Sequence, residues 1–457
     1  MIPLVTVYIT NYNYGSYIRQ AIESLLGQTY KNIEIYIIDD GSTDDSKNII
    51  LQYEHLPNIR IVFQQNKGLN ATNNVAMKLA RGKYLMRLDA DDYLHESAIE
   101  KMVKKIEQEP DAALIFPDYY NVDKNGEIIN EVRRHDFNND VTLLDQPAHG
   151  AITLIKLDVL KKEGGYDEEF TRQDGYDLWL KIAHKYKVIN INEPLFYYRQ
   201  HGKSITDNES ALLKVRGEIK AKHVKGRELE KSKVLAIIPV RGEEVDKRSL
   251  PMRRLGDKEL ICWTIDEALA VPEITDVVIT SPSSSVLDFV NGKYPEEKVI
   301  CLKRGLNLSR INQKIDDTII ETVKRYSENN STPDLIMILY VEAPFRSKQY
   351  IQEAIDTLKL YEVNAVEAVR PDNGIFYVHD GSGLKYIQEN HDLQLERNEI
   401  YRRAGGMHLV KFEQLMKQQN LNFERTGHII LDQKASIFIR SEFDWKVAKL
   451  LIESYEK

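Results

Sequence analysis

Cysteine is scarce in this chain, and the scarcity bears on where the protein works. Its 457 residues include two cysteines, Cys262 and Cys301. Two cysteines provide no disulfide framework, which fits a reducing cytoplasm rather than an oxidising compartment. We therefore expect a cytoplasmic protein.

Long apolar runs are missing as well. No stretch approaches the ~18–20 apolar residues that a membrane-spanning helix needs. The first four residues lack the basic stretch and long apolar core of a signal peptide, so we expect neither a leader nor a span. Peripheral association with the inner face of the membrane stays open, because local patches could suffice where no basic amphipathic helix stands out.

An excess of positive charge is also absent. The formal net charge is -8, which argues against nucleic acid as the main partner. Anionic nucleotides are not excluded, because metal ions and local Lys or Arg side chains can hold them. The 42% hydrophobic and 29% charged content is that of a soluble globular protein. A chain of 457 residues is too long for one ordinary core, so two or three domains are expected.

Short apolar strands alternate with helices in two separate stretches, which predicts an α/β fold in each. Between the stretches the chain is charged and helix-prone. We therefore predict a first domain over residues 1–206, a helical linker over 207–232 and a second domain over 233–457. The halves look like α/β units of related type rather than an exact repeat. The strands expected in the first stretch are Val5–Ile9, Ile33–Ile38, Ile59–Gln64, Gly82–Leu88 and Ala113–Phe116.

Carboxylates follow two of the predicted strands directly. Asp39 and Asp40 end one strand, and the run Leu88-Asp89-Ala90-Asp91-Asp92 ends another. Ligands of open α/β sheets bind at the carboxyl ends of strands. Carboxylate oxygens are the hard ligands that Mg²⁺ and Mn²⁺ prefer, and such an ion would hold a diphosphate. The pattern predicts a metal-assisted nucleotide-diphosphate site at this rim.

Ordered motifs over residues 4–206 resemble family 2 glycosyltransferases. The resemblance implies a GT-A fold and transfer of a hexosyl-type sugar from a nucleoside-diphosphate sugar to a glycan or lipid-linked saccharide hydroxyl, usually with inversion. It also implies a setting in cell-surface glycan or polysaccharide biosynthesis. The matching runs are Val7–Asn13, Ala21–Tyr30, Asp39–Asp44, Asn66–Gly68, Asp89–Asp92, Asp174–Leu180 and Tyr198–His201.

The resemblance places the donor's base and ribose at the end of the first strand, beside Thr10, Asn11 and Tyr12. Tyr12 could offer a stacking face. Asp39 is expected to accept a hydrogen bond from a base N–H. The alternative for Asp39 is a turn or a helix cap, because Asp40-Gly41-Ser42 is also turn chemistry.

The Asp-x-Asp pair divides its roles in this interpretation. Asp89 lies near the ribose, Asp91 binds the metal, and Asp92 stands behind it. His201 resembles the histidine that meets the metal or the diphosphate in some relatives, and a structural role for it is left open. The metal would act as a Lewis acid on the departing diphosphate.

A carboxylate must remove the proton of the acceptor hydroxyl as it attacks. The family's base is an acid before Leu-Trp-Leu, and here that motif has one more residue than the commonest spacing: Asp174-Gly175-Tyr176-Asp177. We favour Asp174, which precedes a glycine that can orient the loop, and expect Asp177 to cap the helix from Leu178. The reverse assignment stays open.

One departure from the family pattern and one further segment bear on the site. Asn73 stands where many relatives carry Arg, which removes a charge near the nucleotide and leaves Lys67 as a nearby candidate. His149-Gly150 lies where relatives place acceptor-facing residues, although His-Gly is also ordinary turn material.

The second half resembles the acylneuraminate cytidylyltransferases, which activate sialic-acid-like sugars with CTP. Homodimers are common among those proteins, so we expect one here. The matching runs are Ala236–Gly242, Leu250–Ile261, Val277–Ser281, Ala343–Arg346, Ala404–Met407 and Ser441–Asp444.

The nucleotide loop of that second half departs from the family. It carries three acids, which would repel a triphosphate by a few kcal/mol at partly screened distances. Three cations could compensate in part and are the candidate nucleotide-binding residues: Arg241, Lys247 and Arg248.

The second half also lacks the family's metal-binding Asp-x-Asp pair, because Phe438 and Arg440 stand in those places. An Arg cannot ligate Mg²⁺ and would oppose it. We therefore predict a glycosyltransferase fused to an inactive cytidylyltransferase-like domain for assembly or ligand binding. The alternatives are a bifunctional enzyme that also makes a CMP-sugar, and a scaffold or binding protein with both halves inactive.

Overall fold

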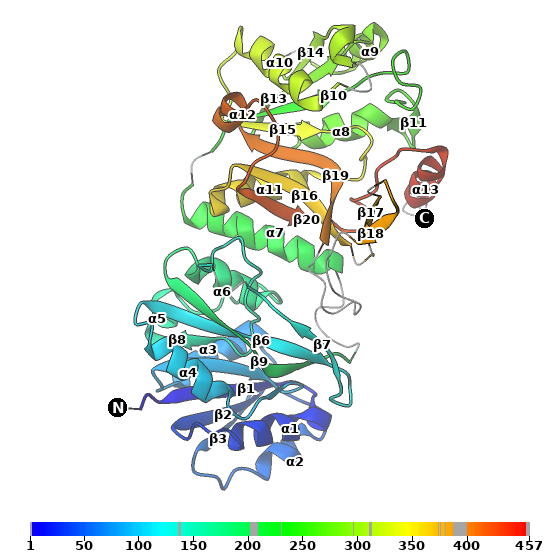
Figure 1. Cartoon of the computed structure of the whole chain (residues 1–457). Helices are drawn as coiled ribbons and strands as arrows, with labels where there is room; N and C mark the ends of the chain where they lie inside the picture. The colour runs from blue at the N-terminus through cyan, green and yellow to red at the C-terminus, as the bar shows by residue number, and fades with distance from the viewer. Residues whose placement is uncertain are drawn as a thin grey trace. The chain divides into compact units, whose positions relative to one another are not determined.

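The computed structural model describes residues 2–135, 139–201, 209–229, 231–295, 297–309, 313–372, 374, 376–379, 381–386 and 400–453. The chain divides into two compact units, one extending to Ile219 and one beginning at Lys220 (Figure 1). The division falls inside the helix α7, Glu209–Gly226, which occupies most of the predicted linker.

The first unit is an α/β structure in which helices cover both faces of a sheet of parallel and antiparallel strands. Within the described residues the sheet has nine strands in the order β3-β2-β1-β4-β8-β6-β9-β5, with β7 paired to β6. The strands are β1 Val5–Asn11, β2 Ile33–Asp39, β3 Ile59–Phe63, β4 Tyr84–Asp89, β5 Tyr93–Leu94, β6 Ala112–Val122, β7 Ile128–Val132, β8 Leu154–Lys156 and β9 Lys187–Arg199. The helices wholly within this unit are α1 Gly15–Leu26, α2 Ser46–Leu51, α3 Leu69–Leu79, α4 Ala98–Glu107, α5 Leu157–Lys162 and α6 Asp174–Ile182.

Two apolar clusters explain why the central strands are apolar at successive positions. Side chains of α1 and α4 pack in one cluster, whereas side chains of α3, α5 and α6 pack in the other. Along β1, Tyr8 belongs to the second cluster and Ile9 to the first. A strand that is covered on both faces has no water-facing positions, so its sequence reads as a continuous apolar run.

The register of the parallel strands brings the candidate residues to one rim. Asn11 lies opposite Asp39 between β1 and β2, and Thr10 lies opposite Asp89 between β1 and β4. Both acidic strand ends therefore flank the end of β1, as the strand assignments predicted.

The second unit contains a seven-stranded sheet within its described residues, in the order β14-β13-β10-β15-β19-β16-β20. Its strands are β10 Val234–Pro239, β11 Arg254–Leu255, β12 Lys258–Glu259, β13 Ile274–Ser281, β14 Val299–Lys303, β15 Leu335–Leu339, β16 Ala365–Asp372, β17 Tyr377–His379, β18 Leu384–Tyr386, β19 Ile400–Lys411 and β20 Thr426–Ile430. Its helices are α8 Leu260–Leu269, α9 Ser284–Lys293, α10 Ile315–Ser327, α11 Lys348–Tyr361, α12 Phe412–Gln418 and α13 Glu442–Glu453, with a 3₁₀ turn η2 at Leu306–Ser309.

The two large sheets share one topology through seven strands. In the first unit β4 and β6 both pair antiparallel with β8, and β6 pairs parallel with β9. In the second unit β15 and β16 both pair antiparallel with β19, and β16 pairs parallel with β20. The four parallel strands that precede these pairs follow the same order in both sheets. The α/β character predicted from the sequence is thus confirmed, and both sheets mix parallel and antiparallel strands.

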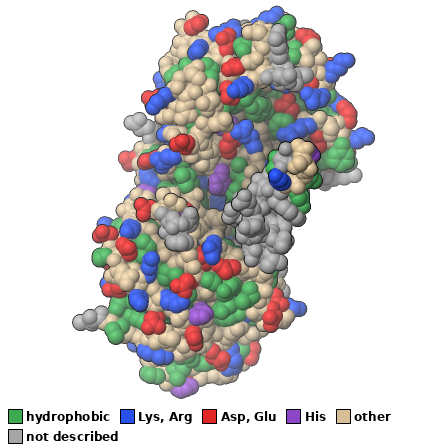
Figure 2. Space-filling view, in the orientation of Figure 1, with side chains coloured by type: hydrophobic (Ala, Val, Ile, Leu, Met, Phe, Trp, Pro, Cys, Tyr) green, Lys and Arg blue, Asp and Glu red, His purple; other side chains and the backbone are tan. Residues whose placement is uncertain are grey.

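On the face shown in Figure 2, acidic and basic side chains are interspersed over each unit. Of the helices that the structure describes, none combines the length and the apolar character that crossing a bilayer requires.

Candidate active site

Side chains at the end of β1 form hydrogen bonds with the acids that end β2 and β4. Thr10 Oγ1 donates to Asp89 Oδ1 at 2.9 Å, and Asn11 Nδ2 donates to Asp39 Oδ2 at 2.7 Å. Asp39 Oδ1 also accepts the Ser42 N–H at 2.9 Å. Both oxygens of Asp39 thus have partners within the fold, so the turn contact considered as its alternative is present. Tyr12, in contrast, is 48% exposed.

Asp40 has a different task from its neighbour Asp39. It is buried, and it accepts the backbone N–H groups of Lys67 and Gly68, each at 2.9 Å. The Gln64 amide donates to it at 2.7 Å. Asp40 therefore holds the loop that precedes α3, and the side chain of Lys67 is exposed on that loop.

Asp91 and His201 meet although 110 positions separate them in the chain. His201 Nε2 lies 2.9 Å from Asp91 Oδ2. The imidazole stacks on Tyr17, with ring centroids 5.7 Å apart, and tilts against Tyr14 at 5.5 Å. Burial raises the pKa of the Asp91 carboxyl, the Asp89 charge raises it further, and the bond with His201 lowers it.

Asp92 and Arg199 support the Asp91 loop from behind. Asp92 Oδ1 accepts the Arg199 N–H at 2.9 Å, while its Oδ2 is buried with no partner. Burial raises the pKa of Asp92 well above its ordinary value, and Asp91 and Asp89 add to the effect. The Arg199 guanidinium donates to the Asp91 carbonyl at 2.8 Å and lies 4.8 Å from the centre of the Tyr17 ring.

Asp174 and Asp177 differ in their surroundings. Asp174 Oδ2 accepts from Arg87, a buried residue on β4 whose Nε also lies 3.0 Å from Asp89 Oδ1. Asp177 Oδ2 lies 2.7 Å from Lys181 Nζ, one turn along the same helix. Asp174 is therefore connected to the donor-side acid Asp89, and Asp177 is paired within α6. The expectation that Asp177 caps a helix from Leu178 is wrong, because α6 begins at Asp174.

Two glycines bring the segment before β8 against α6. A Cβ on Gly175 would lie 2.8 Å from the Gly150 Cα, and a Cβ on Gly150 would lie 2.9 Å from Arg87 Nη2 and 3.0 Å from Asp174 Oδ2. His149 is neutral here, since burial lowers its pKa to about 3, and its Nδ1 accepts the Ala151 N–H at 3.2 Å. Gly175 thus serves close packing rather than loop orientation.

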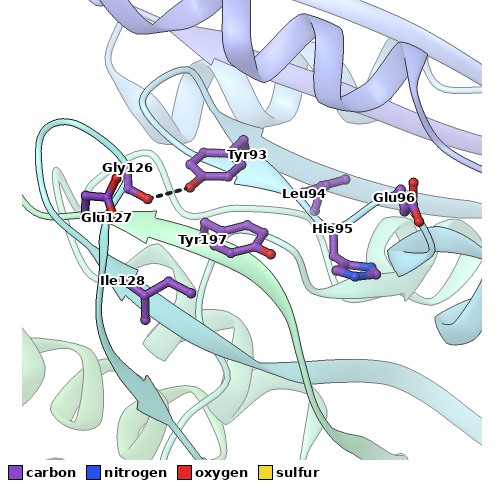
Figure 3. Close-up of a pocket in the computed structure, with 8 residues that line it drawn as sticks. All are labelled: Tyr93, Leu94, His95, Glu96, Gly126, Glu127, Ile128 and Tyr197. Atoms are coloured by element: carbon purple, nitrogen blue, oxygen red, sulfur yellow. Dashed lines mark hydrogen bonds between the residues drawn. The ribbon is translucent and has the colours of Figure 1, made fainter.

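An open groove of about 610 Å³ lies beside the Asp91 loop (Figure 3). The rings of Tyr93 and Tyr197 stack at 4.4 Å, and the Tyr93 hydroxyl donates to the Gly126 carbonyl at 3.2 Å. Arg199 lies over the Tyr93 ring at 5.4 Å. Arg199 therefore contacts both a ring that lines the groove and the loop that carries Asp91. Its lining residues are Tyr93, Leu94, His95, Glu96, Gly126, Glu127, Ile128 and Tyr197.

The donor set at Asp91 suits a divalent cation that a substrate helps to bind. One carboxylate and one imidazole face each other there, and no group of three or more His, Cys, Asp or Glu side chains in the described part of the chain is arranged to hold a metal. Mg²⁺ is commonly bound by one or two carboxylates together with substrate phosphates. These residues fit such an ion as a partial site.

Sequence reasoning missed Arg87 and Arg199 as members of this site. Arg87 was included in a strand, and Arg199 was noted only as part of a motif. A signal was available for Arg87, because arginine is almost never fully buried unless it is paired, and it stands here between Met86 and Leu88. Among the candidate cations of the second unit, Arg241 and Arg248 both approach Asp246, at 3.7 and 3.1 Å.

Comparison with known proteins identifies the first unit. A model of glycosyl transferase family 2 matches residues 6–162. An uncharacterized glycosyltransferase of Methanocaldococcus jannaschii is 34% identical over 213 residues, which cover 43% of this chain and 71% of that protein. The chain belongs to glycosyltransferase family 2. Glycosyltransferase GlyG of Streptococcus pneumoniae serotype 4 is 31% identical, over 46% of this chain and 76% of that protein.

Other proteins that resemble this chain are much longer. The chondroitin synthase of Escherichia coli is 29% identical over 204 residues, which are 44% of this chain and 30% of that enzyme. The chain thus spans less than a third of the length of the first curated relatives that it matches. The family membership supports transferase chemistry for the first unit.

Proposed function

We propose that the first unit is a metal-dependent, inverting glycosyltransferase of the GT-A type. It would move a hexosyl-type sugar from a nucleoside-diphosphate sugar to a hydroxyl of a glycan or lipid-linked saccharide, in cell-surface polysaccharide assembly. The observation that carries the proposal is the meeting of Asp91 with His201 at 2.9 Å, beside a rim where β1 joins the acids of β2 and β4.

In this proposal some residues of the rim bind the nucleotide and others bind the metal. Thr10, Asn11, Tyr12 and Asp39 bind the base and ribose, together with Asp89, and Lys67 approaches the nucleotide from its exposed loop. Asp91 and His201 hold Mn²⁺ or Mg²⁺, which when bound acts as a Lewis acid on the diphosphate.

The base of the reaction is Asp174 in this proposal. Its side chain is 9% exposed and is paired with Arg87, which also contacts Asp89, so the acid lies next to the donor-side residues. Asp177, the alternative base, is engaged by Lys181. As the acceptor oxygen attacks the anomeric carbon, the bond to the diphosphate breaks with its electron pair, and the proton passes to Asp174.

The second unit is proposed as a degenerate cytidylyltransferase-like domain for assembly or ligand binding. Its sheet has the strand order and polarity of the first. Asp246 lies beside two of its three candidate cations, 3.7 Å from Arg241 and 3.1 Å from Arg248. Arg440, which stands where the related enzymes carry a metal-binding acid, lies over the Phe438 ring at 4.8 Å.

Nucleotide binding tests the proposal without knowledge of the acceptor. Melting temperatures of the full chain are measured with UDP, GDP, CDP and ADP, each with and without Mn²⁺. One diphosphate is expected to raise the melting temperature only with Mn²⁺, because the proposed site binds the diphosphate through the metal. A ligand of the folded state stabilises it by about 2.7 kcal/mol at 100 times its Kd. Nucleotide sugars of that base are then screened for slow hydrolysis.

Two substitutions identify the site that is responsible. Asp91→Ala and His201→Ala should each abolish the Mn²⁺-dependent shift, whereas His55→Ala, which removes an exposed histidine of the same unit, should leave it unchanged. Equal hydrolysis by the wild type and Asp91→Ala would contradict the proposal and favour a binding or scaffolding protein.

A further inference from the structure

Arg87 is a buried cation in the middle of an apolar strand. Its side chain is 4% exposed, and two carboxylates converge on it. Nε lies 3.0 Å from Asp89 Oδ1, Nη2 donates to Asp89 Oδ2 at 3.3 Å, and Nη1 donates to Asp174 Oδ2. One planar guanidinium therefore spans two acids that lie 85 positions apart in the chain, on β4 and at the start of α6.

The charge of this cluster is fixed. Burial alone would lower the pKa of the Arg87 guanidinium, but Asp174 and Asp89 hold it well above its ordinary value. Removing one member of a buried pair leaves an uncompensated charge, which is strongly unfavourable. The guanidinium thus stays protonated.

The packing around Asp174 restricts where its carboxylate can lie. Asn73 Nδ2 stands 3.5 Å from Asp174 Oδ2, and the Tyr8 hydroxyl fixes that amide by donating to Asn73 Oδ1 at 3.1 Å. Gly150 covers the Arg87–Asp174 contact so closely that a methyl group would collide with both. A bidentate, planar donor in such a packed site defines direction as well as charge.

We propose that Arg87 is the positioning residue of the transfer reaction. It ties the acid that receives the acceptor's proton to the acid that faces the donor's ribose, so the base is placed relative to the donor before the acceptor enters. The inference rests on the proposed function. Arg87 keeps its own proton throughout, and the acceptor hydroxyl bonds to Asp174 Oδ1, the oxygen that Arg87 leaves to it.

The role predicts a specific kinetic pattern. Arg87→Met should lower kcat about 100-fold, the lower end of what general-base catalysis contributes, and change the donor KM by much less. Arg87→Lys should restore part of the rate, since it returns charge without the planar fork.

A control variant and a folding measurement accompany this test. Arg81→Met removes another arginine that is paired with a carboxylate of the same unit, Glu34, at 2.8 Å, and should leave kcat within about two-fold. Circular dichroism of each variant identifies any that fails to fold. For a variant that folds poorly, the double variant Arg87→Met/Asp174→Asn decides: if Arg87 acts through Asp174, it should be no more than about three-fold slower than Asp174→Asn alone.

The outcomes are distinguishable. A full Arg87→Met loss in the Asp174→Asn background overturns the role of Arg87 while the proposed function stands. An unchanged rate in Asp174→Asn overturns the choice of base and the role with it. Absence of turnover of any nucleotide sugar by the wild type overturns the proposed function itself.

Discussion

At the scale of single residues, the adjacent acids Asp39 and Asp40 have different roles. Asp39 bonds to Asn11 and Ser42 at the rim, whereas Asp40 accepts three N–H groups from the loop before α3. A carboxylate with several donors is a strong acceptor site, and a buried donor left without a partner costs about 1–3 kcal/mol. The second acid therefore maintains the loop that presents Lys67.

Asp40→Asn tests this division. The amide would keep one acceptor oxygen and turn an N–H group toward an existing donor, so we expect a loss of about 1–3 kcal/mol in the free energy of unfolding and weaker binding of the nucleoside diphosphate. Urea denaturation and titration of the diphosphate with Mn²⁺ measure the two effects. Asp111→Asn, at an exposed position, should change neither, and an unaltered Asp40→Asn would show that the loop holds itself.

The candidate residues could be predicted where chemistry and place coincide in the sequence. Asp89 and Asp91 come at the end of a predicted strand, so the location of the site at this rim could be predicted from the order of strands and acids in the sequence. The contact of Asp91 with His201 depends on the route of β9 back to the β5 edge of the sheet, which no local pattern contains. The pairing of Arg87 with Asp174 likewise depends on tertiary packing across 87 positions.

At the scale of elements, the start of α6 determines where the proposed base stands. The helix begins at Asp174, after Gln173 in the left-handed region at φ 63°. The sequence suggested a start at Leu178, with Asp177 as the cap and Gly175 in the loop before it, and glycine is a poor helix residue. Tertiary contact overrides that preference: Gly175 is needed where α6 touches Gly150, since any Cβ would lie 2.8 Å from the Gly150 Cα.

Gly150→Ala is expected to disturb the site through this contact. The added methyl group would meet Arg87 Nη2 and Asp174 Oδ2 at 3.0 Å or less, and overpacking of this kind costs about 1–3 kcal/mol. We expect a lower melting temperature and a lower transfer rate with little change in diphosphate binding. Gly27→Ala, where a Cβ comes no closer than 3.4 Å to a neighbour, is the control. Equal melting temperatures for both variants would contradict the steric argument.

At the scale of the whole molecule, the two large sheets share one topology but carry different charged residues at their candidate sites. The restart of strand–helix alternation at Val234 was sufficient to predict a second α/β unit, because periodicity reflects burial. Shared strand order was not predictable in detail, since it depends on pairings between strands far apart in the chain. The first unit retains acids at its strand ends, whereas the second has Arg440 and an internally paired loop cation, Arg241.

This asymmetry predicts that the full chain turns over a nucleotide sugar but not CTP. Incubation with CTP, a sialic acid and Mg²⁺ should release no pyrophosphate above background, because a cation at position 440 opposes a metal that the reaction needs. A known cytidylyltransferase in the same assay controls for the reagents. Mn²⁺-dependent hydrolysis of the donor should persist in Arg440→Ala, since this residue belongs to the second unit, and should vanish in Asp91→Ala. Pyrophosphate release that Arg241→Ala abolishes would instead establish the bifunctional enzyme, with the carboxylates needed for the metal supplied by residues other than the pair that the second unit lacks.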